Sequence, residues 1–123
     1  MGNETILVIE DNELNMKLVK SLLGIGKYNI LAAEDAESGM QIARENQTDL
    51  ILMDIQLPGM DGLTATGILK ADPDFKDIPI IALTSHAMEG DDKKALDAGC
   101  DGYIAKPIDT KNFLVTIGQF LQR

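Results

Sequence analysis

Five polar side chains stand directly after short apolar runs of the sequence, and the three carboxylates among them could hold a metal ion. Glu10 and Asp11 follow the first run, Asp54 follows the third, Thr84 the fourth and Lys106 the fifth. Three carboxylates brought together repel one another and raise one another's pKa values unless positive charge lies among them. Mg²⁺ prefers oxygen ligands of this kind. Its two charges, with that of Lys106, balance the three carboxylates.

Asp54 is the carboxylate best placed to react, because it stands alone after its run. Glu10 and Asp11 are adjacent and suit a metal, held directly or through water. A carboxylate oxygen beside a cation can attack a phosphoryl group and form an acyl phosphate. Each residue alone has a plainer interpretation. An acidic pair after a strand is typical of a helix N-terminus, where the dipole favours negative charge; Lys106 would be a solvated cation and Thr84 an ordinary strand residue.

The apolar runs themselves predict five β-strands. Each is short, continuous and rich in β-branched or aliphatic residues, as expected of a strand covered on both faces. They occupy residues 6–9, 30–33, 50–53, 80–83 and, more weakly, 103–105. Because ligands of a parallel sheet bind at the carboxyl ends of its strands, the polar side chains are expected to meet at one edge.

Segments with helical spacing alternate with the strands, which implies an α/β fold with a parallel sheet, right-handed crossovers and helices on both faces. Asp35 and Asp109 are the expected N-caps of the second and fifth helices. The third helix ends near Asp72, and the fourth, over residues 87–98, ends at Gly99. The apolar residues that mark the first, second, third and fifth helices are Leu14, Leu18, Leu22, Leu23, Met40, Ala43, Leu63, Ile68, Leu69, Phe113, Leu114, Ile117, Phe120 and Leu121.

Length and composition limit what the chain can do. Its 123 residues, 45% of them hydrophobic, are expected to form a single domain over residues 1–123. Twenty acidic against eleven basic residues give a net charge of −9, which repels nucleic acids and anionic membranes. No apolar run approaches the roughly 18 residues of a membrane span. The lone Cys100 is expected to be a small buried residue in a protein of the reducing cytoplasm.

Four motifs, in order and at the expected strand ends, resemble those of two-component response-regulator receiver domains. The likeness covers essentially the whole chain and rests on Val8–Asn12 (VIEDN), Leu52–Gly62 (LMDIQLPGMDG), Ala82–Ser85 (ALTS) and Tyr103–Pro107 (YIAKP). Each motif alone is weak, whereas the four together are specific. The resemblance implies a flavodoxin-like (βα)5 doubly wound fold with strand order 2-1-3-4-5. Within the family, the run Glu10–Asn15 is similar to stand-alone cell-cycle regulators and to hybrid-kinase receivers.

The resemblance also implies roles at the site. Asp54 would accept the phosphoryl group, and the backbone carbonyl of Gln56 would join the carboxylates as a Mg²⁺ ligand. Lys106 would pair with the phosphoryl oxygens, and Thr84 would donate its hydroxyl to them. Tyr103 would then rotate inward, a switch that repositions the face formed by the fourth helix, the fifth strand and the fifth helix.

Some positions bear on how long the phosphoryl group is kept. Gln56 is not acidic, so no carboxylate two residues beyond the nucleophile assists hydrolysis, and slow autodephosphorylation is expected. His86, the chain's one histidine, either orients water or contacts the phosphodonor, or is a partly exposed loop residue that titrates near neutral pH. Ser85 and Glu10 replace the commoner Ala and Asp of the family. By the same resemblance, the Lys106–Pro107 bond is a cis-peptide candidate.

The expected function is that of a signalling module, not an enzyme. A histidine kinase or histidine phosphotransfer protein would donate the phosphoryl group, and a downstream protein target would respond to changed contacts. The first helix is the expected docking surface for the donor, through Asn12, Leu14, Asn15, Leu18 and Val19. An alternative is that the chain is the receiver domain of a hybrid histidine kinase.

Two functions of other classes share parts of this pattern. A Mg²⁺-dependent phosphatase of the haloacid-dehalogenase type also forms an aspartyl phosphate, but carries Asp-x-Asp after its first strand. Here Asp54, Ile55 and Gln56 lie after the third. A flavodoxin-like flavin-binding protein needs a loop rich in Ser, Thr or Gly after the first strand, where Glu10 and Asp11 would repel the flavin phosphate.

Overall fold

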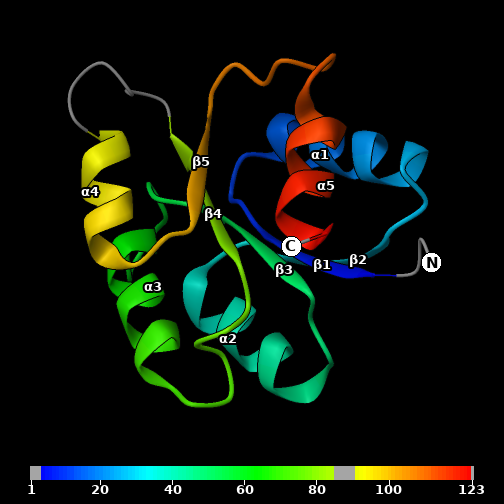
Figure 1. Cartoon of the computed structure of the whole chain (residues 1–123). Coiled ribbons are helices and arrows are strands. Elements are labelled where there is room, and N and C mark those ends of the chain that lie inside the picture. The colour runs from blue at the N-terminus through cyan, green and yellow to red at the C-terminus, as the bar shows by residue number, and fades with distance from the viewer. Residues whose placement is uncertain (1–3, 85–90, 123) are drawn as a thin grey trace.

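The computed structural model describes residues 4–84 and 91–122, which form a five-stranded parallel sheet with its connecting helices (Figure 1). The strands are β1 (Thr5–Ile9), β2 (Asn29–Ala33), β3 (Leu50–Asp54), β4 (Ile80–Thr84) and β5 (Gly102–Ala105). The helices are α1 (Glu13–Ile25), α2 (Ala36–Glu45), α3 (Gly62–Ala71), α4 (Asp91–Ala98) and α5 (Phe113–Gln122). The strands lie in the order β2-β1-β3-β4-β5, so the predicted fold class and strand order are confirmed.

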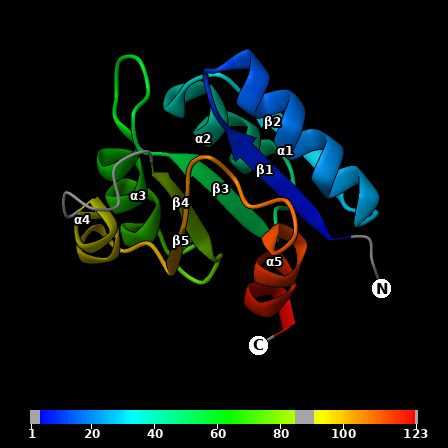
Figure 2. The same cartoon turned by 90° about the horizontal axis from the view of Figure 1, so that it is seen from above.

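The central strands are buried on both faces, because successive side chains alternate between two cores. On β1, Ile6 and Val8 pack in one core and Leu7 and Ile9 in the other. Helices α1 and α5 cover the first face of the sheet, and α2, α3 and α4 cover the second (Figure 2). Every residue of β3 and of β4 is buried. A side chain at the carboxyl end of β3 therefore stands at the centre of the sheet.

Short polar side chains begin three of the helices. Asn12, Asp35 and Asp61 are the N-caps of α1, α2 and α3, and each accepts a hydrogen bond from the backbone N–H three residues on, at 3.0, 2.7 and 2.8 Å. The predicted cap at Asp35 is confirmed. Asp109, the predicted N-cap of the fifth helix, does not stand directly before that helix. Residues 110–112 form a turn, so α5 begins only at Phe113.

The described part of the predicted fourth helix ends where expected. Helix α4 stops at Ala98, and Gly99 follows with φ +114°, a conformation that favours glycine. The predicted start of this helix lies outside the described residues, and so do Ser85 and His86. Cys100 is buried, as predicted.

Two expectations about helix faces are wrong. Leu14 was expected in the apolar stripe of α1 but is 76% exposed, and Val19 is buried with Leu22 and Leu23 instead. At 100° per residue Leu14 lies about 140° around the helix from Val19, too far to share its buried face. Ile68 of α3 is 41% exposed, because at 100° per residue it lies outside the face formed by the buried residues Gly62, Ala65, Thr66 and Leu69.

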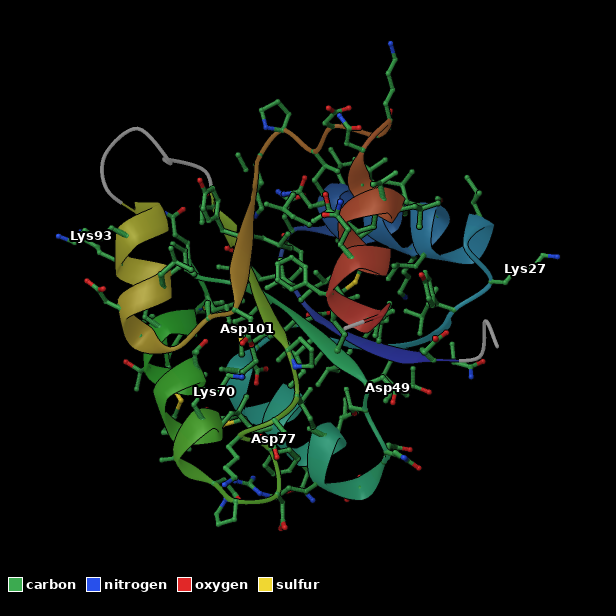
Figure 3. All side chains as sticks on the ribbon, viewed as in Figure 1. Lys27, Asp49, Lys70, Asp77, Lys93 and Asp101 are labelled. Carbon is green, nitrogen blue, oxygen red and sulfur yellow. The ribbon has the colours of Figure 1, made fainter. Side chains whose placement is uncertain are left out.

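A lysine joins α3 to the segments that lead into β4 and β5. Lys70 Nζ donates to Asp101 Oδ2 at 2.8 Å, and both residues are labelled in Figure 3. It also donates to the backbone carbonyls of Ile78 at 2.9 Å and Lys76 at 3.2 Å. Asp101 Oδ2 also accepts the backbone N–H of Ile80 at 2.8 Å. The cluster connects α3, the segment before β4 and the residue before β5. Among the described residues, no helix is long and apolar enough to cross a membrane.

Candidate functional site

A cavity of about 600 Å³ opens at the carboxyl edge of the sheet. Its lining comes from three strand ends and the first turn of α1, and includes Glu10, Asp11, Asp54, Gln56 and Lys106. The structure thus brings together the three carboxylates, the lysine and the glutamine that the sequence singled out. Thr84 and Tyr103 do not line this cavity.

The three carboxylates form one cluster. Glu10, Asp11 and Asp54 each offer an oxygen, and these oxygens lie within 4.8 Å of one another. Glu10 and Asp54 are 1% and 3% exposed, whereas Asp11 is exposed to solvent. Two buried acids and one exposed acid leave one side of the cluster open. A cation could therefore enter from solvent and still keep part of its water shell.

Lys106 bridges the two buried carboxylates. Its ammonium lies 2.9 Å from Glu10 Oε1 and 3.0 Å from Asp54 Oδ2, and its side chain is only 13% exposed. Burial by itself lowers the pKa of Lys106, but the hydrogen bonds and charges of the two carboxylates outweigh it, and the pKa is raised. Lys106 is therefore a permanent positive charge beside Asp54 at neutral pH.

One lysine does not neutralise the site. The pKa of Glu10 is raised to about 7, first by burial and then by the neighbouring Asp54, against the opposing effect of Lys106. The formal charges also leave an excess of negative charge, because three carboxylates outnumber the single ammonium group. The donor set is all oxygen and the charge excess is negative, and both properties fit Mg²⁺.

Backbone N–H groups hold the buried carboxylates in place. The N–H of Gln56 donates to Asp54 Oδ1 at 2.9 Å, and the N–H of Asn12 donates to Glu10 Oε2 at 3.2 Å. Each is a turn in which an acidic side chain bonds the backbone two residues on. The same turn that orients the Asp54 carboxylate thus also carries the carbonyl of Gln56.

Thr84, Tyr103 and Pro107 are described by the structure but do not line this cavity, whereas His86 lies outside the described residues. Thr84 is fully buried at the end of β4, and its hydroxyl has no hydrogen-bond partner among the described residues. Tyr103 is 40% exposed on β5 and lines a separate cavity of about 230 Å³ with Pro107 and Phe113. The Lys106–Pro107 peptide bond is cis.

Sequence reasoning missed a neighbouring cavity of about 490 Å³. It shares Glu10 and Asp11 with the site and extends along α1 past Met16 and Lys17 to Glu34. These residues meet because β2 pairs with β1 and brings residue 34 beside the first turns of α1. Only the order and register of the strands could have revealed it.

The parallel sheet, with an acidic cluster and a lysine at its carboxyl edge, defines a receiver domain. The chain belongs to the response regulator receiver domain family, whose model matches residues 6–117. It is 42% identical to the polar-differentiation response regulator DivK of Brucella anthropi over 118 residues, which cover 96% of each chain. The protein is accordingly a signalling module of two-component systems.

Solved structures of receiver domains agree with this assignment. The receiver domain of the sensor histidine kinase PA1611 from Pseudomonas aeruginosa, with magnesium coordinated in its active-site cleft, is 31% identical, with a TM-score of 0.92 over 98% of this chain and 99% of that one. The receiver domain of Ssk1 from Saccharomyces cerevisiae, crystallised with the histidine phosphotransfer protein Ypd1, is 26% identical. It has a TM-score of 0.88 over 97% of this chain and 89% of that one.

Proposed function

We propose that Asp54 accepts a phosphoryl group from the phosphohistidine of a histidine kinase or phosphotransfer protein, in a Mg²⁺-dependent reaction, and that the phosphorylated chain signals through changed protein contacts. The observation that carries the proposal is the placement of Asp54. Its carboxylate is buried, shares a cluster with two further acids and lies 3.0 Å from an ammonium group. A purely structural aspartate would be destabilised by two further carboxylates close to it.

The residues that would hold Mg²⁺ are Glu10, Asp11 and Asp54, together with the backbone carbonyl of Gln56. Their oxygen donors, grouped within 4.8 Å of one another for the three carboxylates, support this assignment. When bound, Mg²⁺ supplies positive charge that offsets the approach of an anionic phosphoryl group to an anionic carboxylate. The magnesium in the cleft of the PA1611 receiver domain is consistent with such a site.

In the transfer step, an oxygen of Asp54 forms a bond to phosphorus while the bond from phosphorus to the donor imidazole nitrogen breaks, and the released imidazole takes up a proton. Lys106 places its ammonium beside this carboxylate and is positioned to pair with the phosphoryl oxygens. The N–H of Gln56 orients the attacking carboxylate. The chain itself therefore supplies the nucleophile, one charge and the alignment.

Switching would begin at Thr84. A phosphorylated Asp54 presents new acceptor oxygens, and the Thr84 hydroxyl is a buried donor without a partner among the described residues. Its movement toward the phosphoryl group would make room for Tyr103 to turn inward from its half-exposed position. The surface formed by α4, β5 and α5 would change, and a downstream protein would bind it.

The phosphorylated state should last, because Gln56 offers no carboxylate to activate water. The donor would dock over the first turns of α1, where Leu14 is 76% exposed beside the cavity. The complex of Ypd1 with the Ssk1 receiver domain supports a partner of this kind. The net charge of −9 supports protein rather than nucleic-acid partners, and we place the protein in the cytoplasm.

Replacing Asp54 tests the proposal directly. We expect Asp54→Asn to abolish phosphoryl transfer from a candidate kinase, because the amide is not a nucleophile, whereas the unaltered protein should gain a label that is labile to acid and to hydroxylamine. Asp61→Asn is the matched control, because it removes a carboxylate from the same loop and keeps a good helix cap. Undiminished labelling of Asp54→Asn would assign the chemistry to another residue.

A further inference from the structure

Gly62 begins α3 and lies directly against the carboxyl end of β3. Its N–H donates to the carbonyl of Ile55 at 3.3 Å. A Cβ at this position would overlap the backbone carbonyl oxygen of Asp54 and come within 2.7 Å of the Cα of Ile55. Both neighbours are backbone atoms, so no side-chain rotation could relieve the overlap. Any larger residue would have to push α3 and the end of β3 apart.

Other glycines of the chain are packed differently. A Cβ at Gly39 would meet the end of the Ile9 side chain, which can adjust, and a Cβ at Gly67 would meet nothing within 4 Å. Gly67 lies on the exposed side of α3, five residues beyond Gly62. Tight contact with the backbone that bears the phosphoacceptor is thus particular to Gly62 among these three.

We infer that Gly62 is a positioning residue for the phosphoacceptor and for the metal site. The missing side chain lets α3 seat against the backbone that carries Asp54. The adjoining turn carries Gln56, whose N–H bonds the Asp54 carboxylate at 2.9 Å. Displacement of α3 would therefore move the nucleophile and the Gln56 carbonyl together. The inference rests on the proposed function of Asp54.

A buried hydroxyl group also fixes the position of Gly62 from within α3. Thr66 is fully buried, and its Oγ1 donates to the carbonyl oxygen of Gly62 at 2.8 Å. The first turn of α3 is thus fixed by a hydrogen bond on its own helix and by Ile55 across the interface. Because Gly62 is bonded on both sides, a shift of its backbone would shift the adjoining turn that carries Gln56.

The test is Gly62→Ala, with acetyl phosphate as the phosphodonor so that protein docking plays no part. We expect the rate constant for labelling Asp54 to fall about 10-fold or more, since small misplacements of reacting groups have effects of this size. We also expect weaker Mg²⁺ binding by calorimetry on the metal alone. A change in Mg²⁺ affinity of the folded protein is an effect that a loss of stability alone would not produce.

Two variants of the same helix serve as controls. Gly67→Ala adds the same methyl group in open space and should leave labelling and Mg²⁺ affinity unchanged. Leu69→Ala removes a buried side chain of α3 seven residues beyond Gly62 and should lower stability only. If Leu69→Ala weakens Mg²⁺ binding as much as Gly62→Ala does, or if Gly62→Ala matches the unaltered protein, the inference is overturned. Absent labelling of the unaltered protein would instead overturn the proposed function.

A measurement on the unaltered protein decides the matter if Gly62→Ala does not fold. Coupling between two sites is reciprocal. If the contact of Gly62 with the end of β3 strengthens Mg²⁺ binding, then Mg²⁺ binding must strengthen that contact. Hydrogen exchange of the Gly62 amide should slow on addition of Mg²⁺ by more than that of the Gly67 amide, which reports the general gain in stability. Equal slowing of the two amides would contradict the inference.

Discussion

The hydroxyl of Thr84 is a buried polar group that the resting protein leaves without a partner among the described residues. Such a group has lost its hydrogen bonds to water without replacement, which costs about 1–3 kcal/mol of stability. Thr66 is buried to the same degree, but its hydroxyl donates to the Gly62 carbonyl. The two threonines therefore differ in hydrogen bonding and not in burial.

This difference predicts opposite effects of the same substitution. Thr84→Val should raise the free energy of unfolding by about 1 kcal/mol, because it replaces the unpaired hydroxyl with a methyl group of similar shape. Thr66→Val should not raise it, because a hydrogen bond is lost there. Urea unfolding of the unphosphorylated proteins measures both changes. A Thr84→Val protein less stable than the unaltered one would show that the hydroxyl has a partner in the resting state.

The residues of the site could be named from the sequence, because each stands at the end of an apolar run and the strand ends of a parallel sheet meet. Which carboxylates pair with Lys106 could not be predicted. Lys106 had three carboxylates available, and the structure pairs it with Glu10 and Asp54 and leaves Asp11 exposed. Which acids are buried depends on the backbone of the turns after β1 and β3, and the residue types do not determine it.

At the scale of whole elements, Lys70 is the clearest link between α3 and the rest of the fold. Its ammonium bonds two backbone carbonyls and the Asp101 carboxylate, and its side chain is 18% exposed. The carbonyls of Lys76 and Ile78 belong to the connection that leads into β4. Loss of the ammonium would leave these acceptors to find water, and the connection would lose its attachment to α3.

We therefore expect Lys70→Met to lower the free energy of unfolding by about 1–2 kcal/mol, the usual value of one or two partly buried hydrogen bonds to a charged group. Denaturant unfolding measures the change. Lys76→Met is the control, because it removes the same charge from an exposed side chain and should change stability by less than about 0.5 kcal/mol. Equal effects of the two substitutions would mean that only net charge matters.

The elements were predictable to differing degrees. The strands were found because a strand buried on both faces is a continuous apolar run, and all five strands include the predicted residues. Helix faces were less certain. The apolar stripe predicted for α1 included Leu14, whereas the docking of the helix on the sheet buries Val19 and leaves Leu14 exposed. That choice depends on packing against β1 and β3, which the spacing of leucines cannot determine.

For the whole molecule, the acidic cluster makes stability depend on pH in an unusual direction. The pKa of Glu10 is about 7 in the folded protein against 4.5 for the ordinary group. Between these pH values the folded chain binds a proton that the unfolded chain releases. The contribution of Glu10 to stability is therefore fully present below about pH 4.5 and is lost as the pH rises through about 7. Without metal, this contribution should make the protein less stable at pH 8 than at pH 5.5.

Two comparisons isolate this effect in urea unfolding across that range. Glu10→Gln cannot lose the proton, so its stability should fall less with pH than that of the unaltered protein. Added Mg²⁺ should stabilise the unaltered protein more at pH 8 than at pH 5.5, because at the proposed site the metal would bind the ionised carboxylate. Identical pH slopes for the two proteins would contradict the raised pKa of Glu10.

The complete burial of β3 has a consequence for how the protein responds to modification. Asp54 is the last residue of a strand with a neighbouring strand on each side and helices over both faces. If Asp54 is phosphorylated as proposed, the strand beneath it has no room to recede. The accommodation must come from the loops and helices at the margin of the molecule, which are the parts another protein can touch.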